Sequence, residues 1–204
     1  MVRRTKEEAQ ATRNRILDTA EMVFHERGVS HTTLQDIASA AGVTRGAIYW
    51  HFRDKGELFN AMLERVVLPL ESEALRVDAR SVEDPLAAMR ENFAAALRKT
   101  VDDPQARRVF EIATHKVEYV GELHVVRERH LASRNDCLLH GERALRRAVR
   151  RGQLSLAIPA RSAALGLHAL IDGLIQNWTL EPRAFDLVKV GTQVLDAYLE
   201  GIRA

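Results

Sequence analysis

Five residues that suit contact with nucleic acid follow one another closely in one short segment: Thr44, Arg45, Gly46, Tyr49 and His51. A guanidinium can donate two parallel hydrogen bonds to the edge of guanine in the major groove of DNA. A short helix that begins here also presents free backbone N–H groups and the positive end of its dipole to phosphate. We therefore expect Arg45 and Thr44 to touch bases or phosphates, and Tyr49 and His51 to hold mainly phosphates.

The residues around this segment indicate how it is positioned. Thr33 can cap one helix, and Asp36 at the third position of that helix completes a capping box. Gly42 lies where the chain must turn through a left-handed conformation, which a side chain would resist. Thr44 can cap a second helix, whose Ile48 points inward. This order of helix, tight turn and short helix is typical of a helix-turn-helix, whose second helix enters the major groove.

The segment TLQDIASAAGVTRGAIYWHFRDK (residues 33–55) closely resembles the DNA-binding domain of the TetR family of bacterial transcriptional repressors. The first 30 residues and the stretch EIATHKVEYVGEL (residues 111–123) resemble more narrowly the Acr/Ttg group of that family, which represses multidrug-efflux operons. The resemblance implies an all-α fold of about nine helices. A three-helix helix-turn-helix DNA-binding domain would occupy residues 1–54, and a helical ligand-binding and dimerisation domain residues 55–204.

The same resemblance implies a function. A homodimer would bind a palindromic operator in double-stranded DNA and block transcription of an efflux operon, until a hydrophobic or aromatic small molecule releases it. Thr33 and Lys55 would join the residues that hold phosphates. Two other regulators of the same fold stay open as alternatives: one that senses a metabolite such as an acyl thioester, and one that senses a metal ion.

Composition excludes several other classes of protein. The chain has 204 residues and one cysteine, which rules out an internal disulfide framework and fits a reducing cytoplasm. No apolar run approaches the roughly 18 residues of a membrane span, and the charged N-terminus lacks a signal segment, so we expect a cytoplasmic protein without membrane contact. Arg3, Arg4 and Lys6 form a basic arm that follows a phosphate backbone or remains a solvated tail.

Helix start and stop signals recur along the rest of the chain, which shows no strand-like alternation. Helix starts are predicted at four capping patterns: Thr5 to Glu8, Asp54 to Glu57, Asp84-Pro85 and Asp103-Pro104. Helices are predicted to stop at Gly28 and at Gly152, and the arginines just before Gly152 are typical of an ordinary last turn. Pro69 interrupts an otherwise helical pattern, so we expect a kink or a break there.

Two final helices, about 160–180 and 184–202, are predicted to form the dimer surface. Each carries an apolar stripe: Ala163, Leu167, Leu170, Leu174 and Trp178 on the first, and Val188, Leu195, Tyr198 and Leu199 on the second. On periodicity alone, such stripes are more often monomer core than interface. The helix-turn-helix favours the interface, because one such unit contacts too few base pairs for useful specificity and a two-fold dimer doubles the contacts.

The effector site is predicted among the middle helices and on the first of these two. His168, Asp172 and Gln176 recur every four residues in an otherwise apolar stretch, where a carboxylate is costly unless paired or hydrated. They are polar anchors of a mostly hydrophobic pocket, or they face solvent or bond across the dimer. The resemblance adds further pocket residues: Val67, Met89, Phe93, Phe110, Thr114, Cys137 and Ile171. Val67 and Phe110 are apolar where relatives can carry polar side chains, which favours an apolar ligand.

Other chemistry finds little support in the sequence. Three pairs of metal-ligand residues occur: Glu111 with His115, Cys137 with His140, and His124 with His130. The first two pairs are helical neighbours, but no compact cluster of three or four ligands is evident. The sequence has no nucleophile elbow, Gly-rich phosphate loop or HExxH motif, so we expect neither an enzyme nor a bound cofactor.

Overall fold

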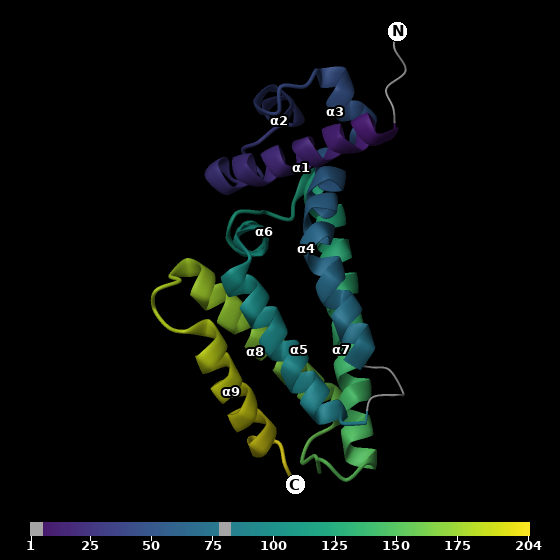
Figure 1. Ribbon diagram of the computed structural model, residues 1–204, viewed down its shortest axis with the longest axis vertical. Helices are drawn as coiled ribbons and strands as arrows, with labels where there is room; N and C mark the ends of the chain where they lie inside the picture. The colour runs from purple at the N-terminus through teal and green to yellow at the C-terminus, as the bar shows by residue number, and fades with distance from the viewer. Residues whose placement is uncertain (1–5, 78–82) are drawn as a thin grey trace. The chain divides into compact units, whose positions relative to one another are not determined.

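The computed structural model describes the backbone of residues 6–77 and 83–204 and the side chains of residues 6–69 and 83–204. Over these residues the chain forms nine α-helices and one 3-10 helix and no strand (Figure 1), which confirms the all-α prediction. The helices are α1 (Lys6–Arg27), α2 (Leu34–Ala40), α3 (Arg45–His51), α4 (Lys55–Val77), α5 (Pro85–Asp102), α6 (Pro104–His115), η1 (Gly121–Leu123), α7 (His124–Arg150), α8 (Ala160–Leu180) and α9 (Leu187–Gly201). Among them is no helix with the length and apolar character needed to cross a membrane.

The chain divides into two compact units, and each is discontinuous in sequence. Unit 1 comprises Met1–Val66 and Glu111–His130, and unit 2 comprises Val67–Phe110 and Leu131–Ala204. Unit 1 therefore contains α1, α2, α3 and η1, whereas unit 2 contains α5, α8 and α9. Three helices, α4, α6 and α7, contribute residues to both units.

Unit 1 is built around the apolar face of α1. The ring of Phe24, which is fully buried, lies 5.9 Å from the ring of Phe59 on α4, measured between centroids. Helix α1 ends as predicted, because Gly28 adopts φ +80, a conformation that side chains resist. Helix α2 packs on α1 and contacts α3 (Figure 1), and Ile37 and Ile48 are completely buried. Each such side chain contributes about 2 kcal/mol by leaving water, which fixes α3 on the unit.

Unit 2 is a packed set of helices in which α5, α8 and α9 all contact one another (Figure 1). Helices α5 and α9 approach closely at Gly191, where an added Cβ would overlap Cδ1 of Leu97. Gly166 on α8 likewise leaves room for the ring of Tyr198 on α9. The hydroxyl of Tyr198 donates to the carbonyl of Ala163 at 2.8 Å, so α9 is joined to α8 by a hydrogen bond as well as by packing.

The helix starts follow the predicted capping patterns. Asp84 and Asp103 each accept hydrogen bonds from backbone N–H groups of the helix that they precede, α5 and α6. At the start of α4, Asp54 accepts from the N–H of Glu57 at 2.8 Å. The Glu57 carboxylate accepts from the N–H of Arg53 and not from that of Asp54, so this half of the box is displaced by one residue. Outside the described residues lie the predicted cap of α1 and part of the predicted basic arm: Thr5, Arg3 and Arg4.

Helix α4 continues through Pro69 to Val77, so the predicted break at this proline is wrong. Pro69 lacks the N–H that would bond to the carbonyl of Arg65. Both residues are exposed, and that carbonyl can therefore be hydrated instead. A kink at Pro69 stays a prediction.

The ends of the last three helices agree closely with the predicted ranges. Helix α7 ends at Arg150, shortly before Gly152, which adopts φ +71. Helix α8 occupies the predicted range of 160–180. Helix α9 begins at Leu187, later than the predicted residue 184, because Asp186 caps it by accepting from the N–H of Lys189 at 2.9 Å.

Candidate DNA-binding and effector-binding sites

The helix-turn-helix predicted at residues 33–55 is formed by α2, the turn at residues 41–43, and α3. Gly42 adopts φ +63, as its position predicts, and its N–H donates to the carbonyl of Ser39 at 3.2 Å. The N–H of Val43 donates to the carbonyl of Ala38 at 3.0 Å. These two bonds make a Schellman motif, which satisfies the last carbonyls of α2 and fixes the direction in which the chain continues to α3.

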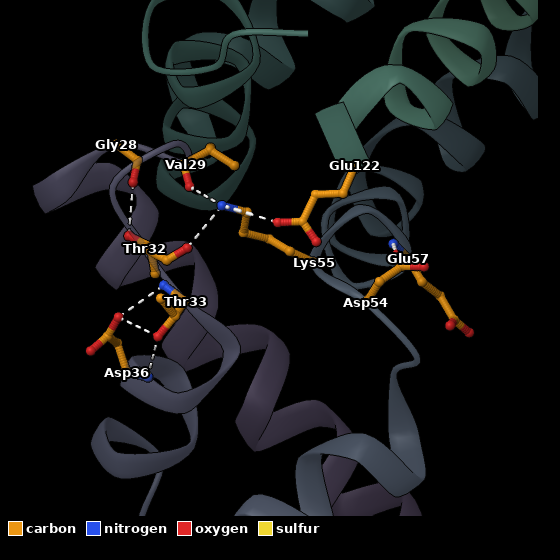
Figure 2. Close-up of polar contacts among 9 residues, drawn as sticks. All are labelled: Gly28, Val29, Thr32, Thr33, Asp36, Asp54, Lys55, Glu57 and Glu122. Atoms are coloured by element: carbon orange, nitrogen blue, oxygen red, sulfur yellow. Dashed lines mark hydrogen bonds and ion pairs between the residues drawn. The ribbon is translucent and has the colours of Figure 1, made fainter. Parts of the chain in front are cut away.

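The start of α2 carries the complete capping box (Figure 2). The hydroxyl oxygen of Thr33 accepts from the N–H of Asp36 at 3.1 Å, and the Asp36 carboxylate accepts from the N–H of Thr33 at 2.8 Å. The Thr33 hydroxyl also donates to that carboxylate, so a phosphate contact by Thr33 would compete with this bond. The hydroxyl bond first, and the backbone N–H bond second, lower the pKa of Asp36 below its ordinary value of 3.8.

Acidification is expected to weaken the start of α2 through Asp36. A carboxyl whose pKa is lower in the folded chain than in the unfolded chain stabilises the fold above its ordinary pKa, and this contribution is lost as the pH falls through the lowered value. We expect the wild type to melt at a higher temperature than Asp36→Asn near neutral pH, and this difference to shrink below about pH 4. Thermal unfolding followed by circular dichroism measures it. A difference that does not change with pH would contradict the assignment.

Helix α3 presents Arg45 and Tyr49 on an exposed face. Thr44 caps this helix, as predicted, by accepting from the N–H of Ala47 at 3.2 Å. The guanidinium carbon of Arg45 lies 5.6 Å from the centroid of the Tyr49 ring, whose face attracts the cation. Ile48 is fully buried and anchors the helix. The arrangement holds a planar hydrogen-bond donor at the exposed start of a short helix, where a base edge can meet it.

Trp50 is an exposed residue of α3 that sequence reasoning places on the outer face of the helix but not among the predicted DNA contacts. Its side chain is 72% exposed, and its ring meets that of His51 edge-on, at 4.6 Å between centroids and 86° between planes. His51 is half-buried, and Gly46 is exposed. The sequence signal for Trp50 was its position two residues after the inward-facing Ile48, on the opposite side of the helix.

Lys55, which sequence reasoning assigns to phosphate, is buried in unit 1. Its ammonium donates to the carbonyls of Val29 and Thr32, each at 2.9 Å, and lies 3.5 Å from the carboxylate of Glu122 (Figure 2). Only 10% of the side chain is exposed. The three ammonium hydrogens can all be taken up by these three protein oxygens. The geometry therefore favours a structural role for Lys55 over the predicted phosphate contact.

The predicted effector residues fall mostly in unit 2, and only Thr114 belongs to unit 1. Met89 and Phe93 on α5 are buried in the core of unit 2, and Ile171 on α8 packs against that core. Three more are half-buried, so that part of each side chain stays accessible: Val67, Phe110 and Cys137. Met89, Phe93 and Ile171 thus lie in or against the core of unit 2, and their assignment to an effector pocket stays a prediction.

The polar members of the predicted effector site lie along α8. The Nε2 atom of His168 is 3.2 Å from Oδ2 of Asp172. That Nε2 atom is itself buried, and the contact lacks the geometry of a hydrogen bond. A buried polar atom without a hydrogen bond is costly, so the position suits a ligand that supplies one. Gln176 is exposed, in agreement with the alternative that it faces solvent.

An open apolar hollow of about 410 Å³ lies on α8 and α9 in unit 2. It is lined by Ala169, Leu170, Gly173, Leu174, Asn177, Phe185, Val190 and Val194. Five residues of the predicted dimer stripes are instead buried within the protomer: Ala163, Leu167, Trp178, Leu195 and Leu199. The prediction is wrong for these five, because periodicity identifies an apolar stripe but not the element that covers it.

Glu111, which forms a candidate metal pair with His115 in the sequence, has other partners in unit 1. Its carboxylate lies 3.0 Å from Nε2 of His25 and 3.3 Å from Nζ of Lys116. Partial burial raises the pKa of Glu111, but the hydrogen bonds and positive charges of His25 and Lys116 together outweigh burial and lower that pKa. Within residues 6–69 and 83–204, no group of three or more His, Cys, Asp or Glu residues is arranged to hold a metal ion.

Comparisons with known proteins agree with a helix-turn-helix domain followed by a C-terminal helical domain. The family described as bacterial regulatory proteins, tetR family, matches residues 16–62, and the MAATS-type transcriptional repressor C-terminal region matches residues 84–203. The chain is 42% identical to the transcriptional regulator TtgR of Pseudomonas putida, over 100% of this chain and 97% of TtgR.

Solved structures of efflux-pump repressors are also similar. The structure of NalD, the secondary repressor of the MexAB-OprM multidrug efflux pump in Pseudomonas aeruginosa, is 37% identical with a TM-score of 0.89 over 97% of this chain and 98% of NalD. The SmeT–triclosan complex is 37% identical with a TM-score of 0.86, over 96% of this chain and 93% of that chain. SmeT represses the multidrug efflux pump SmeDEF of Stenotrophomonas maltophilia.

Proposed function

This chain belongs to the TetR family of bacterial transcriptional regulators, and we propose that it is a ligand-responsive repressor that binds a palindromic operator as a homodimer. Members of this family are regulators and not enzymes, and they bind operator DNA. The observation that carries the proposal is the exposed face of α3, where Arg45 lies over the ring of Tyr49 while Ile48 anchors the helix. The resemblance to repressors of multidrug efflux pumps supports repression as the mode of regulation.

In this proposal, residues 1–54 form the DNA-binding domain and residues 55–204 the ligand-binding and dimerisation domain. Arg45 and Thr44 contact bases or phosphates from the start of α3, with Gly46 allowing the backbone to approach. Tyr49 and His51 hold phosphates and set the register of α3 in the major groove. This division of roles predicts that Arg45 carries most of the sequence preference.

Two copies of the chain associate through the hollow on α8 and α9. Its lining is almost wholly apolar, and Val190 and Val194 contribute to it from α9. Leu165 and Leu180 on α8 are 53% and 68% exposed, which adds apolar surface that water disfavours. Burying such a surface against its two-fold copy gives a dimer that presents two α3 helices to a palindrome.

The effector in this proposal is a hydrophobic or aromatic small molecule, and the regulated operon encodes a multidrug efflux pump. A structure of SmeT in complex with triclosan has been solved, and NalD is the secondary repressor of a multidrug efflux pump. In this chain, Met89, Phe93 and Ile171 supply apolar surface, and the buried Nε2 atom of His168 supplies a polar anchor. The effector must bind the DNA-incompetent state more tightly, by about 1–3 kcal/mol, to release the operator.

Effector binding is expected to slow alkylation of Cys137. This residue is the only cysteine of the chain and is half-buried, so a thiol reagent reports on it alone. A molecule that fills a pocket bordered by Cys137 excludes the reagent in proportion to its occupancy. Mass spectrometry of iodoacetamide-treated protein, with triclosan as the first probe, measures the rate. Protein unfolded in guanidinium, with and without triclosan, is the control. A compound that releases DNA without slowing the reaction would remove Cys137 from the pocket.

The proposed function is tested by selecting genomic fragments on the purified protein. We expect recovery of one or a few palindromic sites upstream of genes for an efflux pump, with one protomer bound for each half-site. Recovery of fragments without a shared sequence would contradict operator binding. A shared site upstream of genes that do not encode a pump would keep the repressor and overturn its assignment to efflux.

A further inference from the structure

The turn between α1 and α2 is held by partners that lie far away in the sequence. Lys55, the first residue of α4, donates to the carbonyls of Val29 and Thr32 (Figure 2). The N–H of Val29 donates to the carbonyl of Lys116, at 2.9 Å, just after α6. Within the turn, the hydroxyl of Thr32 donates to the carbonyl of Gly28 at 2.8 Å. The carbonyl of Val29 also accepts from the N–H of Thr32 within the turn, at 3.3 Å, so Val29 bonds both to its own turn and to two distant segments.

The first turn of α4 also packs closely against η1 and the first turn of α7. An added Cβ at Gly56 would lie 2.8 Å from the carbonyl oxygen of Glu122 and 2.8 Å from Cγ2 of Val125. The carboxylate of Glu122 faces the ammonium of Lys55 at 3.5 Å. The ammonium of Lys55 therefore lies between the α1–α2 turn and η1. If the side chain turned toward solvent, the ammonium would lose its contacts with both segments.

We propose that Lys55 is a positioning residue for operator reading, a buried tie that fixes the α1–α2 turn on α4, and that it does not contact phosphate. This inference rests on the proposed function of α3 as the reading helix. A phosphate contact would require the ammonium to leave two carbonyls in a site where its side chain is 10% exposed. The carbonyl of Val29 would keep the N–H of Thr32 as a donor at 3.3 Å, but the carbonyl of Thr32, in a residue that is only 1% exposed, would lose the ammonium. A buried carbonyl that loses its donor is costly, so the tie is the more stable arrangement.

The tie acts on the reading helix through a short chain of contacts. Thr32, which accepts from Lys55, directly precedes Thr33, the cap of α2 (Figure 2). Helix α2 in turn contacts α3, and the Schellman motif at Gly42 fixes the connection between them. A turn that loses its hold on α4 therefore shifts the cap of α2, and with it the position from which Arg45 approaches a base.

The test compares Lys55→Met, which keeps the length of the apolar stem and removes the ammonium, with Arg53→Gln. The side chain of Arg53, two residues before Lys55, is 84% exposed. Its variant therefore removes one positive charge near the start of α4 but breaks no buried contact. We expect Lys55→Met to lower operator affinity by about tenfold, to melt several degrees lower and to exchange amide hydrogens of residues 29–36 faster. Arg53→Gln is expected to leave melting and exchange unchanged.

Non-specific DNA separates the tie from a phosphate contact. If Lys55 is a buried tie, the Lys55→Met variant keeps the wild-type affinity for a scrambled duplex, and this affinity depends on salt as it does in the wild type. Both quantities are measured well below the melting temperature of the variant. A phosphate contact would reduce the slope of log affinity against log salt by about 0.9 for each protomer, and would weaken all DNA alike. That result, or a variant with wild-type melting and exchange, would overturn the proposal. If the wild-type protein selected no operator, the proposed function would fail, whereas the melting and exchange results would still test the tie.

Discussion

Replacing Arg45 with alanine is expected to weaken operator binding by about tenfold or more for each half-site and to relax sequence preference. The guanidinium is exposed at the start of α3 and held over the ring of Tyr49. A bidentate contact to guanine discriminates by about 1–3 kcal/mol, and alanine removes both donors. Ile48 stays buried in the variant, so the helix remains in place. Competition between operator and scrambled duplexes, followed by fluorescence anisotropy at fixed salt, measures affinity and preference together.

Arg150→Ala is the matched control for Arg45→Ala. It removes an exposed arginine from the last turn of α7, so total charge changes equally while the reading face is untouched. Its operator affinity and selectivity are expected to equal those of the wild type. Operator affinity and selectivity that both stay at wild-type levels in Arg45→Ala would show that α3 is not the reading helix.

Replacing Val194 with aspartate is expected to convert the dimer into a monomer and to lower operator affinity by about a hundredfold or more. Val194 lines the apolar hollow on α8 and α9, and a carboxylate buried there without a partner is costly. A single protomer can hold only one half-site. Analytical ultracentrifugation is expected to give the mass of one chain for the variant and of two for the wild type, with the helical circular dichroism unchanged.

Thr192→Asp is the control for the charge itself. Thr192 is exposed on α9 and lies about 160° around the helix from Val194, so an aspartate there faces away from the hollow. It is expected to remain dimeric and to bind the operator normally. A dimeric Val194→Asp with full operator affinity would place the interface elsewhere on the chain.

The helix-turn-helix could be predicted because each of its signals is local. The capping box at Thr33 depends on a residue three positions away, and Gly42 adopts a positive φ that its place after α2 requires. Thr44 likewise caps a helix that starts at the next residue. Local hydrogen bonds of this kind are determined by residue types at short spacing, and the structure confirms all three.

Properties that depend on distant segments could not be read in the same way. Lys55 follows the helix-turn-helix like a residue free to meet phosphate, but its carbonyl partners lie 26 and 23 residues earlier. The apolar stripes that contain Leu167 on α8 and Leu195 on α9 have a period that fits an interface and a core alike, and both residues lie in the core of unit 2. Long-range contacts such as these follow from tertiary packing, which periodicity does not encode.

The effector site illustrates a third case, in which resemblance supplied residues that spacing alone did not indicate. Spacing selected His168 and Asp172, and the structure brings their side chains to 3.2 Å of each other. Met89 and Phe93 came from the family resemblance and lie in the core of unit 2. An apolar residue on an amphipathic helix looks the same whether it borders a pocket or fills a core, so composition cannot distinguish the two.

The central claim, a ligand-responsive repressor, is tested most directly by fluorescence anisotropy of labelled DNA from upstream of this gene, titrated with protein at fixed salt. The titration is repeated with a scrambled duplex and with a panel of hydrophobic and aromatic compounds that includes triclosan. We predict tight binding selective for the upstream sequence and release of that sequence, but not of scrambled DNA, by at least one compound. Selective binding that every compound leaves unchanged would contradict the claim.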